Sequence, residues 1–401
     1  MHSGKGTIPV SFPSSKMKFE KEDGNQNDWK LESWNLKLET PFVSRRSRPK
    51  YPTPGARRKR RGGGLRWLMA LVLVAGAVWF WREHEQPKKF VRVSASSPVP
   101  AAARPQVQPL TVSRQSPADF PRPIHDVLEA QIALARRGIS PGSIDAALGS
   151  QTRAAISVFQ GIENLPPTGK LDTDTRAKLT LDAPLLASYI MTTNDLARLQ
   201  PLGKTWLAKS RQTALDFETE LELVAEKSHS HPLLIQKLNL NVNWTNLAAG
   251  TVLIIPDVNY PDPTNKAAFV VIHLSEKFLE AFDEKTNLLA HFPCSIAAKV
   301  EKRPLGELRV DAIAFPANYT FDPELFPESG ETQKLILPPG PNNPVGIAWI
   351  SLDKPGYGIH GTPAPEQIGR TESHGCFRLA NWDAEYLLKL AWVGIPVVVE
   401  P

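Results

Sequence analysis

A nearly unbroken apolar run at residues 65–81, LRWLMALVLVAGAVWFW, places the strongest limit on how this chain can be arranged. Its 17 residues are at the short end of what an α-helix needs to cross a hydrocarbon core, and Arg66 can extend its charge to the headgroups. The tryptophans at both ends suit the two membrane interfaces. We therefore predict a single transmembrane helix at residues 65–81.

The charges around this run predict its direction. Five basic residues lie directly before it, namely Arg57, Arg58, Lys59, Arg60 and Arg61. Basic residues stay on the cytoplasmic side, so the N-terminus is predicted to be cytoplasmic and everything after residue 82 to be exported. A cleaved signal peptide is the alternative, but the run begins far from Met1 and no small-residue cleavage site follows it.

The net charge of +6 is concentrated in residues 1–64, which hold 15 Lys and Arg against six Asp and Glu and leave the remainder of the chain at −3. This segment lacks apolar periodicity, so we predict that residues 1–64 are a disordered basic cytoplasmic segment. It has no recognisable nucleic-acid-binding module, so no nucleic-acid partner is expected. Residues 82–121, rich in Pro and Ala, are predicted to be an extended linker.

Helical apolar spacing, interrupted by two turn clusters, predicts a small helical domain at residues 122–182. This segment resembles the three-helix peptidoglycan-binding module through the sequence LEAQIALARRGISPGSIDAALGSQTRAAISVFQ, followed by LPPTGKLDTDTRAKL. Ala146 stands where that module usually has a glycine. The resemblance implies a wall-binding role, with a purely structural spacer as the alternative.

Residues 212–258 are predicted to form a small α+β domain. The order helix, helix and strand is indicated by the sequence ELVAEKSHSHPLLIQKLN followed by NLAAGTVLIIP. It resembles the lysin-motif glycan-binding module, although Glu218, Thr219 and Glu220 replace the usual GDT element. His229 and His231 are predicted to be solvated residues of the turn between the helices, because two histidines without a third ligand do not indicate a metal site.

Residues 266–401 alternate apolar residues in short runs at 268–274, 288–296, 307–315, 346–352 and 395–400, which predict strands. One amphipathic helix is expected from about residue 382 to 392, capped by Asn381 and ended by Gly394. Together they predict a mostly-β sandwich with one helix. The Pro-rich stretch 316–344 is predicted to be a lid beside the cleft.

Within this segment, residues 360–379 read HGTPAPEQIGRTESHGCFRL. A thiol attacks carbonyls only as thiolate, so a nucleophilic Cys376 requires a nearby imidazole and a group that orients that imidazole. His360 and His374 are both candidates, because His374 is two residues away and the fold can bring His360 close. The spacing by itself does not choose between them.

The HGT and SHGC elements resemble the signature of L,D-transpeptidases of the YkuD type, and RPLGELRV and GPNNPVGIAWISL extend the resemblance over residues 266–401. The resemblance implies that Cys376 is the nucleophile, that His360 is the base and that the Gly361 carbonyl orients it. It implies that His374, Gly375 and Ser373 shape the oxyanion site. Arg378 is expected to bind a substrate carboxylate, because a guanidinium forms a two-pronged pair with that group.

The activity implied is peptidoglycan cross-linking. Cys376 forms a thioester with a stem tetrapeptide, D-alanine leaves, and the acyl group passes to an amine. The alternatives are an L,D-carboxypeptidase that uses water and a non-catalytic peptidoglycan-binding anchor. The expected partners are stem peptides and glycan, with no metal and no cofactor, and the oligomeric state is left open. The expected location is the bacterial cytoplasmic membrane, with the catalytic domain in the periplasm or cell-wall space.

Other enzyme classes fit less well. Penicillin-binding transpeptidases use SxxK with two partner motifs, and only the SLDK at Ser351 occurs here. Papain-like hydrolases place the cysteine before its histidine, which is the reverse of the order here. Cys294, in an apolar run, is predicted to be a buried structural residue that does not pair with Cys376.

Overall fold

The computed structural model describes residues 8–11, 16–21, 29–31, 119–371, 373 and 375–401. Its contacts divide the chain into two compact units, residues 1–106 and 107–401, and each is described by itself. No helix among the described residues is long and apolar enough to span a bilayer. The predicted transmembrane helix at 65–81, and the linker up to residue 118, lie outside these residues.

The first unit holds an antiparallel sheet of β1 (Ile8–Ser11), β2 (Lys16–Lys21) and β3 (Trp29–Leu31). The prediction that residues 1–64 are disordered therefore differs from the structure in these three segments. In β2, Met17 and Phe19 alternate with charged residues, which is the period of a strand. Two apolar residues in a highly charged segment barely change its composition, so the composition did not indicate a strand there.

The second unit begins with three helices, α2 (Val127–Ala135), α3 (Ser150–Ile162) and α4 (Thr173–Lys178), as predicted for residues 122–182. The short strands β4 (Arg122–Pro123) and β5 (Thr180–Leu181) pair and join its two ends. Asp126 and Asp172 cap α2 and α4 by accepting backbone N–H groups. Ala146 has a φ of 63°, the left-handed conformation that a glycine adopts readily.

The next segment pairs β6 (Leu186–Ile190) with β7 (Val252–Pro256) around α7 (Glu220–Lys227) and α8 (Pro232–Leu238). The helix, helix and strand order predicted for 212–258 is present. The prediction omitted β6, together with α5 (Thr193–Ala197) and α6 (Trp206–Ser210). The resemblance to a lysin motif remains a prediction.

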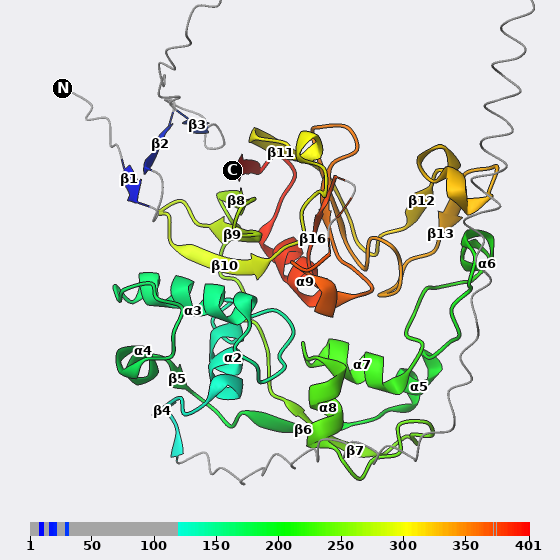
Figure 1. Cartoon of the computed structure of the whole chain (residues 1–401), viewed down its shortest axis with the longest axis horizontal. Helices are drawn as coiled ribbons and strands as arrows, with labels where there is room; N and C mark the ends of the chain where they lie inside the picture. The colour runs from blue at the N-terminus through cyan, green and yellow to red at the C-terminus, as the bar shows by residue number, and fades with distance from the viewer. Residues whose placement is uncertain (1–7, 12–15, 22–28, 32–118, 372, 374) are drawn as a thin grey trace, which may run out of the picture. The chain divides into compact units, whose positions relative to one another are not determined.

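The carboxyl-terminal part is built on one eight-stranded sheet with the order β10-β9-β8-β17-β11-β14-β15-β16. Its strands are β8 (Phe269–His273), β9 (Phe278–Phe282), β10 (Leu288–Pro293), β11 (Gly306–Ala314), β14 (Trp349–Leu352), β15 (Gly358–His360), β16 (Phe377–Arg378) and β17 (Pro396–Glu400). Helix α9 (Asn381–Leu390) lies between β16 and β17 in the chain (Figure 1).

The predicted sandwich is joined through one strand. Residues 306–309 of β11 pair with β17, whereas residues 310–314 pair with β14. The two halves of the sheet therefore share β11, and side chains from both halves and from α9 form one apolar core. Beyond β10, Ser295 forms an antiparallel bridge to Arg378 in β16, so the chain after one edge strand meets the other edge strand.

The predicted lid contains the hairpin β12 (Tyr319–Phe321) and β13 (Leu335–Leu337), together with the 3-10 turns η3 (Pro323–Leu325) and η4 (Pro327–Ser329). The remaining 3-10 turns are η2 (Val300–Lys302) and η5 (Pro365–Gln367). The hairpin lies beside α6 (Figure 1), where Trp206 stacks on Phe321 with ring centroids 4.5 Å apart. An aromatic contact thus attaches the lid to the preceding segment.

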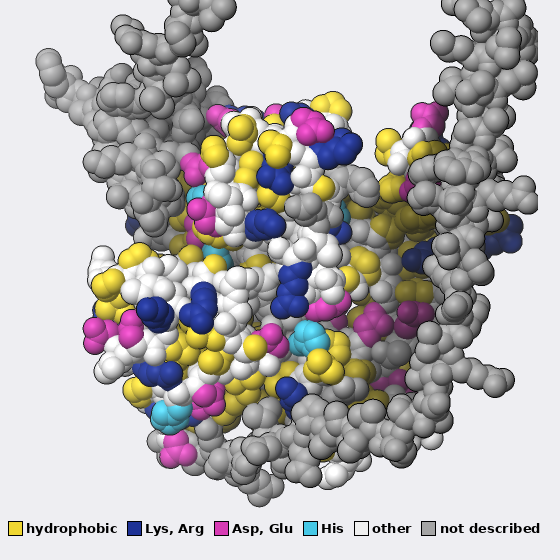
Figure 2. Space-filling view, viewed as in Figure 1, with side chains coloured by type: hydrophobic (Ala, Val, Ile, Leu, Met, Phe, Trp, Pro, Cys, Tyr) yellow, Lys and Arg dark blue, Asp and Glu magenta, His cyan; other side chains and the backbone are white. Residues whose placement is uncertain are grey.

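Basic and acidic side chains are interspersed on the face shown in Figure 2, and no large area of that face carries one sign of charge. This agrees with the sequence, in which the excess positive charge belongs to residues 1–64.

Candidate active site

The parallel pair β15–β16 brings the predicted base and nucleophile to one face of the sheet. Ile359 pairs with Phe377, and His360 pairs with Arg378. Ile359 and Phe377 are each 1% exposed and belong to the core. Because side chains alternate along a strand, His360, Cys376 and Arg378 share the opposite face. The residue opposite Cys376 is then Gly358, which has no side chain to cover the thiol.

The His360 ring is held on two sides. Its Nδ1 lies 2.6 Å from the Gly361 carbonyl oxygen, and Trp349 on the neighbouring strand stacks on it at 5.5 Å. A carbonyl only accepts, so Nδ1 carries the proton and Nε2 is the acceptor nitrogen. Burial lowers the pKa of His360 to about 4, and the charge of Arg378 acts in the same direction. The imidazole is therefore neutral at pH 7.

The Cys376 thiol is partly buried. Its Sγ lies 3.6 Å from the Gly356 carbonyl oxygen. Burial raises the pKa of Cys376, while a hydrogen bond with the Gly358 backbone and the charge of Arg378 act to lower it. Arg378, which is predicted to bind a substrate carboxylate, thus also acts to lower the pKa values of Cys376 and His360.

The turn before Cys376 is held through Ser373. The Ser373 hydroxyl donates to the Cys376 carbonyl oxygen at 2.5 Å and accepts from the Gly375 N–H at 3.3 Å. The Ser373 N–H donates to Ile296 at 2.8 Å, in the chain that follows β10. Ser373 and Gly375 therefore lie in the turn that leads into Cys376, and their role in an oxyanion site stays a prediction. His374 lies outside the described residues.

Asn381 has a role that the sequence did not indicate. The prediction made it the cap of the last helix, but Ala380 is the cap and Asn381 is 1% exposed. Its Oδ1 accepts from Ile347 at 3.2 Å and from Thr362 at 3.1 Å. Thr362 is two residues after His360, so this side chain holds the loop that carries the base.

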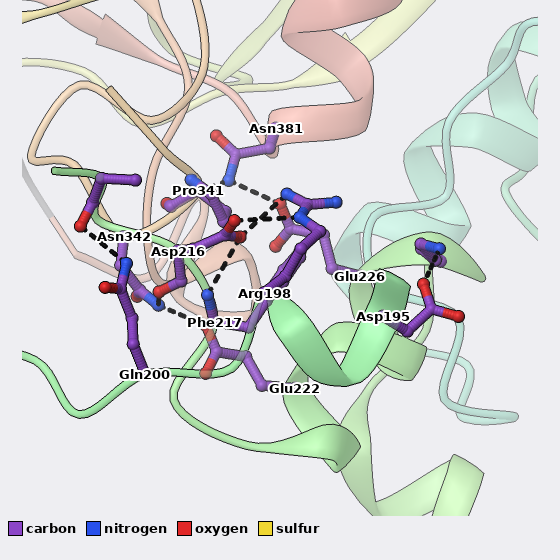
Figure 3. A network of polar contacts seen from close by, with 12 residues as sticks. Asp195, Arg198, Gln200, Asp216, Phe217, Glu222, Glu226, Pro341, Asn342 and Asn381 are labelled. Atoms are coloured by element: carbon purple, nitrogen blue, oxygen red, sulfur yellow. Dashed lines mark hydrogen bonds and ion pairs between the residues drawn. The ribbon is translucent and has the colours of Figure 1, made fainter. Parts of the chain in front are cut away.

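Asn381 also links this loop to the preceding domain, as Figure 3 shows. Its Nδ2 donates to Glu226 of α7 at 2.6 Å and to the Pro341 carbonyl at 3.2 Å (Figure 3). Burial raises the pKa of Glu226 to about 8. Beside it, Asn342 donates to the Glu222 carboxyl at 2.5 Å. The loop before β14 is therefore attached to α7 by side-chain hydrogen bonds.

The glycine after the base is required by this packing. A Cβ atom added to Gly361 would lie 2.2 Å from Asn381 Oδ1, and one added to Gly346 would lie 2.0 Å from it. Both distances are far below any real contact, so a larger residue at either position displaces the Asn381 amide. The glycine of the HGT element thus has a steric role in addition to the carbonyl that orients His360.

The remaining predicted residues make other contacts. Cys294 is buried and unpaired, and burial raises its pKa to about 12. The prediction that His229 is solvated is wrong, because its ring stacks on Trp382 at 5.2 Å and contacts Tyr260 at 5.0 Å. Burial lowers its pKa to about 3. His231 caps α8 by accepting from the Leu233 N–H. Among the described residues, no three His, Cys, Asp or Glu side chains form a cluster suited to a metal ion.

Fold and site together define a class of protein: a β-rich domain that presents a thiol and a neutral imidazole on neighbouring strands, preceded by a small helical domain. Comparison with known families gives the same answer. Residues 267–399 match the L,D-transpeptidase catalytic domain (YkuD), and residues 125–179 match the putative peptidoglycan binding domain. These two parts of the chain are similar to those families.

Individual relatives carry related names. The putative L,D-transpeptidase YkuD of Bacillus licheniformis is 26% identical over 181 residues, which cover 45% of this chain and 93% of that protein. The probable L,D-transpeptidase YbiS of Escherichia coli is 31% identical over 160 residues, which cover 37% of this chain and 49% of that protein. The chain thus spans only about half the length of this second relative.

Two solved structures of L,D-transpeptidases are similar to part of this chain. One from Xylanimonas cellulosilytica is 14% identical, with coverage of 70% of this chain and 98% of that one and a TM-score of 0.31. L,D-transpeptidase 3 of Mycobacterium tuberculosis is 16% identical, with 39% and 77% covered and a TM-score of 0.28.

Proposed function

We propose that this protein is a peptidoglycan L,D-transpeptidase in which Cys376 is the nucleophile and His360 is the general base. The family of residues 267–399 supports the reaction class. The observation that carries the assignment is the hydrogen bond from His360 Nδ1 to the Gly361 carbonyl, which leaves Nε2 as the proton acceptor on the face shared with Cys376.

The reaction proceeds by acyl transfer. The Cys376 proton passes to His360 Nε2 as Sγ bonds to the carbonyl carbon that precedes the terminal D-alanine of a stem tetrapeptide. Backbone N–H groups near Cys376 stabilise the resulting oxyanion. His360 then protonates the departing amine, the C–N bond breaks, and D-alanine leaves a thioester on Cys376.

The second half of the reaction uses the same residues. An acceptor amine gives a proton to His360 and attacks the thioester carbon, the C–S bond breaks, and the sulfur recovers the proton. A new amide cross-link results. Water in place of the amine yields a tripeptide, which is the L,D-carboxypeptidase alternative. The neutral state of both groups at pH 7 means that the thiolate forms during attack.

The architecture around the catalytic domain fits an enzyme that works on the wall from a membrane. We propose that residues 65–81 anchor the chain in the cytoplasmic membrane, with residues 107–401 in the periplasm or cell-wall space. The domain at residues 125–179 would bind peptidoglycan. The lysin-motif-like segment would bind glycan beside it.

Intact mass after incubation with a disaccharide tetrapeptide tests the proposal. The parent protein and a Cys294→Ala variant are expected to gain a thioester adduct and to release D-alanine, whereas Cys376→Ala gains and releases nothing. Muropeptide analysis then separates dimer from tripeptide. Release of D-alanine by Cys376→Ala would disprove the assignment. Binding to wall sacculi without adduct or product from the parent would favour the non-catalytic anchor.

A further inference from the structure

A cavity of about 250 Å³ lies where three parts of the second unit meet. Residues of the peptidoglycan-binding domain between positions 141 and 154 form one wall, and strand and loop residues of the catalytic domain form the other. His231, at the start of α8, also lines it. Neither Cys376 nor His360 is among its lining residues. The cavity is therefore separate from the candidate catalytic pair.

The cavity nevertheless touches the segment that joins the base to the nucleophile. Glu366, Ile368, Gly369 and Arg370 line it, and all lie between His360 and Cys376 in the chain. Gln151 of α3 donates to the Ile368 carbonyl at 2.6 Å. The Gly369 N–H donates to Ser295 Oγ at 2.9 Å. Ser295 in turn pairs with Arg378, so the cavity wall is connected by hydrogen bonds to the strand of the nucleophile.

The lining carries charges of both signs. Lys277 and Arg370 supply cations, and the carboxylates belong to Asp145, Glu276 and Glu366. A group that bears both an ammonium and a carboxylate complements such a lining, because each end finds an opposite charge.

One buried group in the wall indicates a ligand. His291 is fully buried, and Ala290 and Phe292 on either side of it belong to the core, so its side chain lies on the other face of β10. Phe278, another lining residue, contacts it there with ring centroids 4.8 Å apart. His291 Nδ1 lies 3.1 Å from Glu280, whose pKa is lowered to about 2 by its two histidine neighbours despite burial.

Because that carboxylate is ionised, His291 Nδ1 donates to it. Within the described part of the chain, His291 Nε2 and Ser143 Oγ are buried without a hydrogen-bond partner, and both residues line the cavity. A buried polar atom without a partner is unfavourable, so a hydrogen-bonding group from a ligand would satisfy His291 Nε2.

The size of the cavity limits the ligand. Drug-sized ligands fill pockets of roughly 300–1,000 Å³. This cavity is smaller, so its volume suits the amino and carboxyl groups of a single amino acid more than a disaccharide. We propose that it is a second binding site for a wall stem peptide, which holds the free amino and carboxyl groups at the side-chain end of its diamino acid. The site rests on the proposed function, and it would hold a neighbouring peptide while another reacts at Cys376.

The test uses the detergent-solubilised full chain alkylated at Cys376, so that the catalytic cleft is blocked. Calorimetry measures binding of a stem tripeptide ending in diaminopimelate. The double variants Lys277→Met with Arg370→Gln and Glu276→Gln with Glu366→Gln are expected to bind at least tenfold more weakly. Lys285→Met, a change at an exposed lysine outside the cavity, is the matched control and is expected to bind like the parent.

Two altered tripeptides probe the chemistry. Acetylation of the side-chain amine removes the ammonium, and lysine in place of diaminopimelate removes the distal carboxylate; both are expected to bind at least tenfold more weakly. Cavity variants that bind like Lys285→Met, or displacement of the tripeptide by a disaccharide without peptide, would overturn the site. The two proposals can fail separately. If the cavity variants weaken tripeptide binding but the unalkylated protein transfers no acyl group, the binding site is upheld and the proposed function is rejected.

Discussion

Cys376 and His360 are held in the states that do not carry charge. Burial raises the pKa of the thiol and lowers that of the imidazole to about 4, so at neutral pH the pair is neutral. The Arg378 charge lowers both pKa values and so favours the thiolate while it disfavours an imidazolium. Attack and proton transfer are therefore expected to occur together, with no preformed ion pair.

This arrangement predicts how the thiol reacts with iodoacetamide. Only the thiolate reacts, and its fraction rises about tenfold per pH unit below the pKa. Alkylation of Cys376 is therefore expected to accelerate about tenfold per unit from pH 6 to pH 8 and to continue rising above pH 9. Peptide mapping by mass spectrometry follows Cys376, with buried Cys294 as the unreactive internal control. A rate that is already constant between pH 6 and 7 would indicate a preformed thiolate and contradict the prediction.

At the scale of elements, the active site depends on contacts between segments that are distant in sequence. Asn381 at the start of α9 accepts hydrogen bonds from backbone N–H groups before β14 and after β15. Its side-chain amide also donates a hydrogen bond to Glu226 of α7. The lid hairpin is held against α6 by Trp206. Loop geometry near the base therefore depends on elements of two domains.

Replacing Asn381 by Ala is expected to lower the free energy of unfolding by about 2–4 kcal/mol, because two buried N–H groups lose their acceptor. It is also expected to lower kcat, since the loop after His360 loses its support. Urea titration and D-alanine release measure the two effects. Glu226→Gln is the matched control, because it keeps an acceptor for Asn381 Nδ2 and is expected to change stability by less than about 1 kcal/mol. A loss below about 1 kcal/mol with unchanged kcat for Asn381→Ala would show that the contact does not position the base.

At the scale of the whole second unit, a buried carboxyl joins the domains. Asp383 of α9 accepts from Tyr260 at 2.5 Å and from Ser140 of the peptidoglycan-binding domain at 3.2 Å. Burial raises the pKa of Asp383 to about 7. In the unfolded chain an aspartate has a pKa of about 3.9, so the folded state binds more protons between these values. The contribution of Asp383 to stability is therefore present at low pH and is lost as pH rises through 7.

A pH comparison tests this sign. Urea unfolding of residues 107–401 at pH 5 and pH 8 gives the difference in unfolding free energy between Asp383→Asn and the parent. We expect this difference to shift in favour of the variant by at least about 1 kcal/mol at pH 8, since one pKa unit corresponds to about 1.4 kcal/mol. The exposed Glu284→Gln serves as the control and is expected to show no such shift. A difference that stays constant, or shifts toward the parent, would show that Asp383 is ionised already at pH 5.

The sequence by itself determined the features that depend on local pattern. Period-two alternation located β8, β10, β11, β14 and β17, helical spacing located α2 and α3, and the HGT and SHGC elements selected His360 and Cys376. Strand β9 was missed although its residues, FLEAF, are mostly apolar, because five residues between two predicted strands give little signal.

Only the tertiary structure decided which distant residues meet. Trp349 stacks on His360 because β14 and β15 pair, and the His229 ring is packed against Trp382 and Tyr260, which come from other parts of the chain. We predicted that Asn381 caps a helix because a cap can be predicted from neighbouring residues. The hydrogen-bond partners of its side chain instead lie 19 to 155 residues away in the chain. Pairing and burial between distant segments follow from the packing of the whole unit, and no local pattern encodes them.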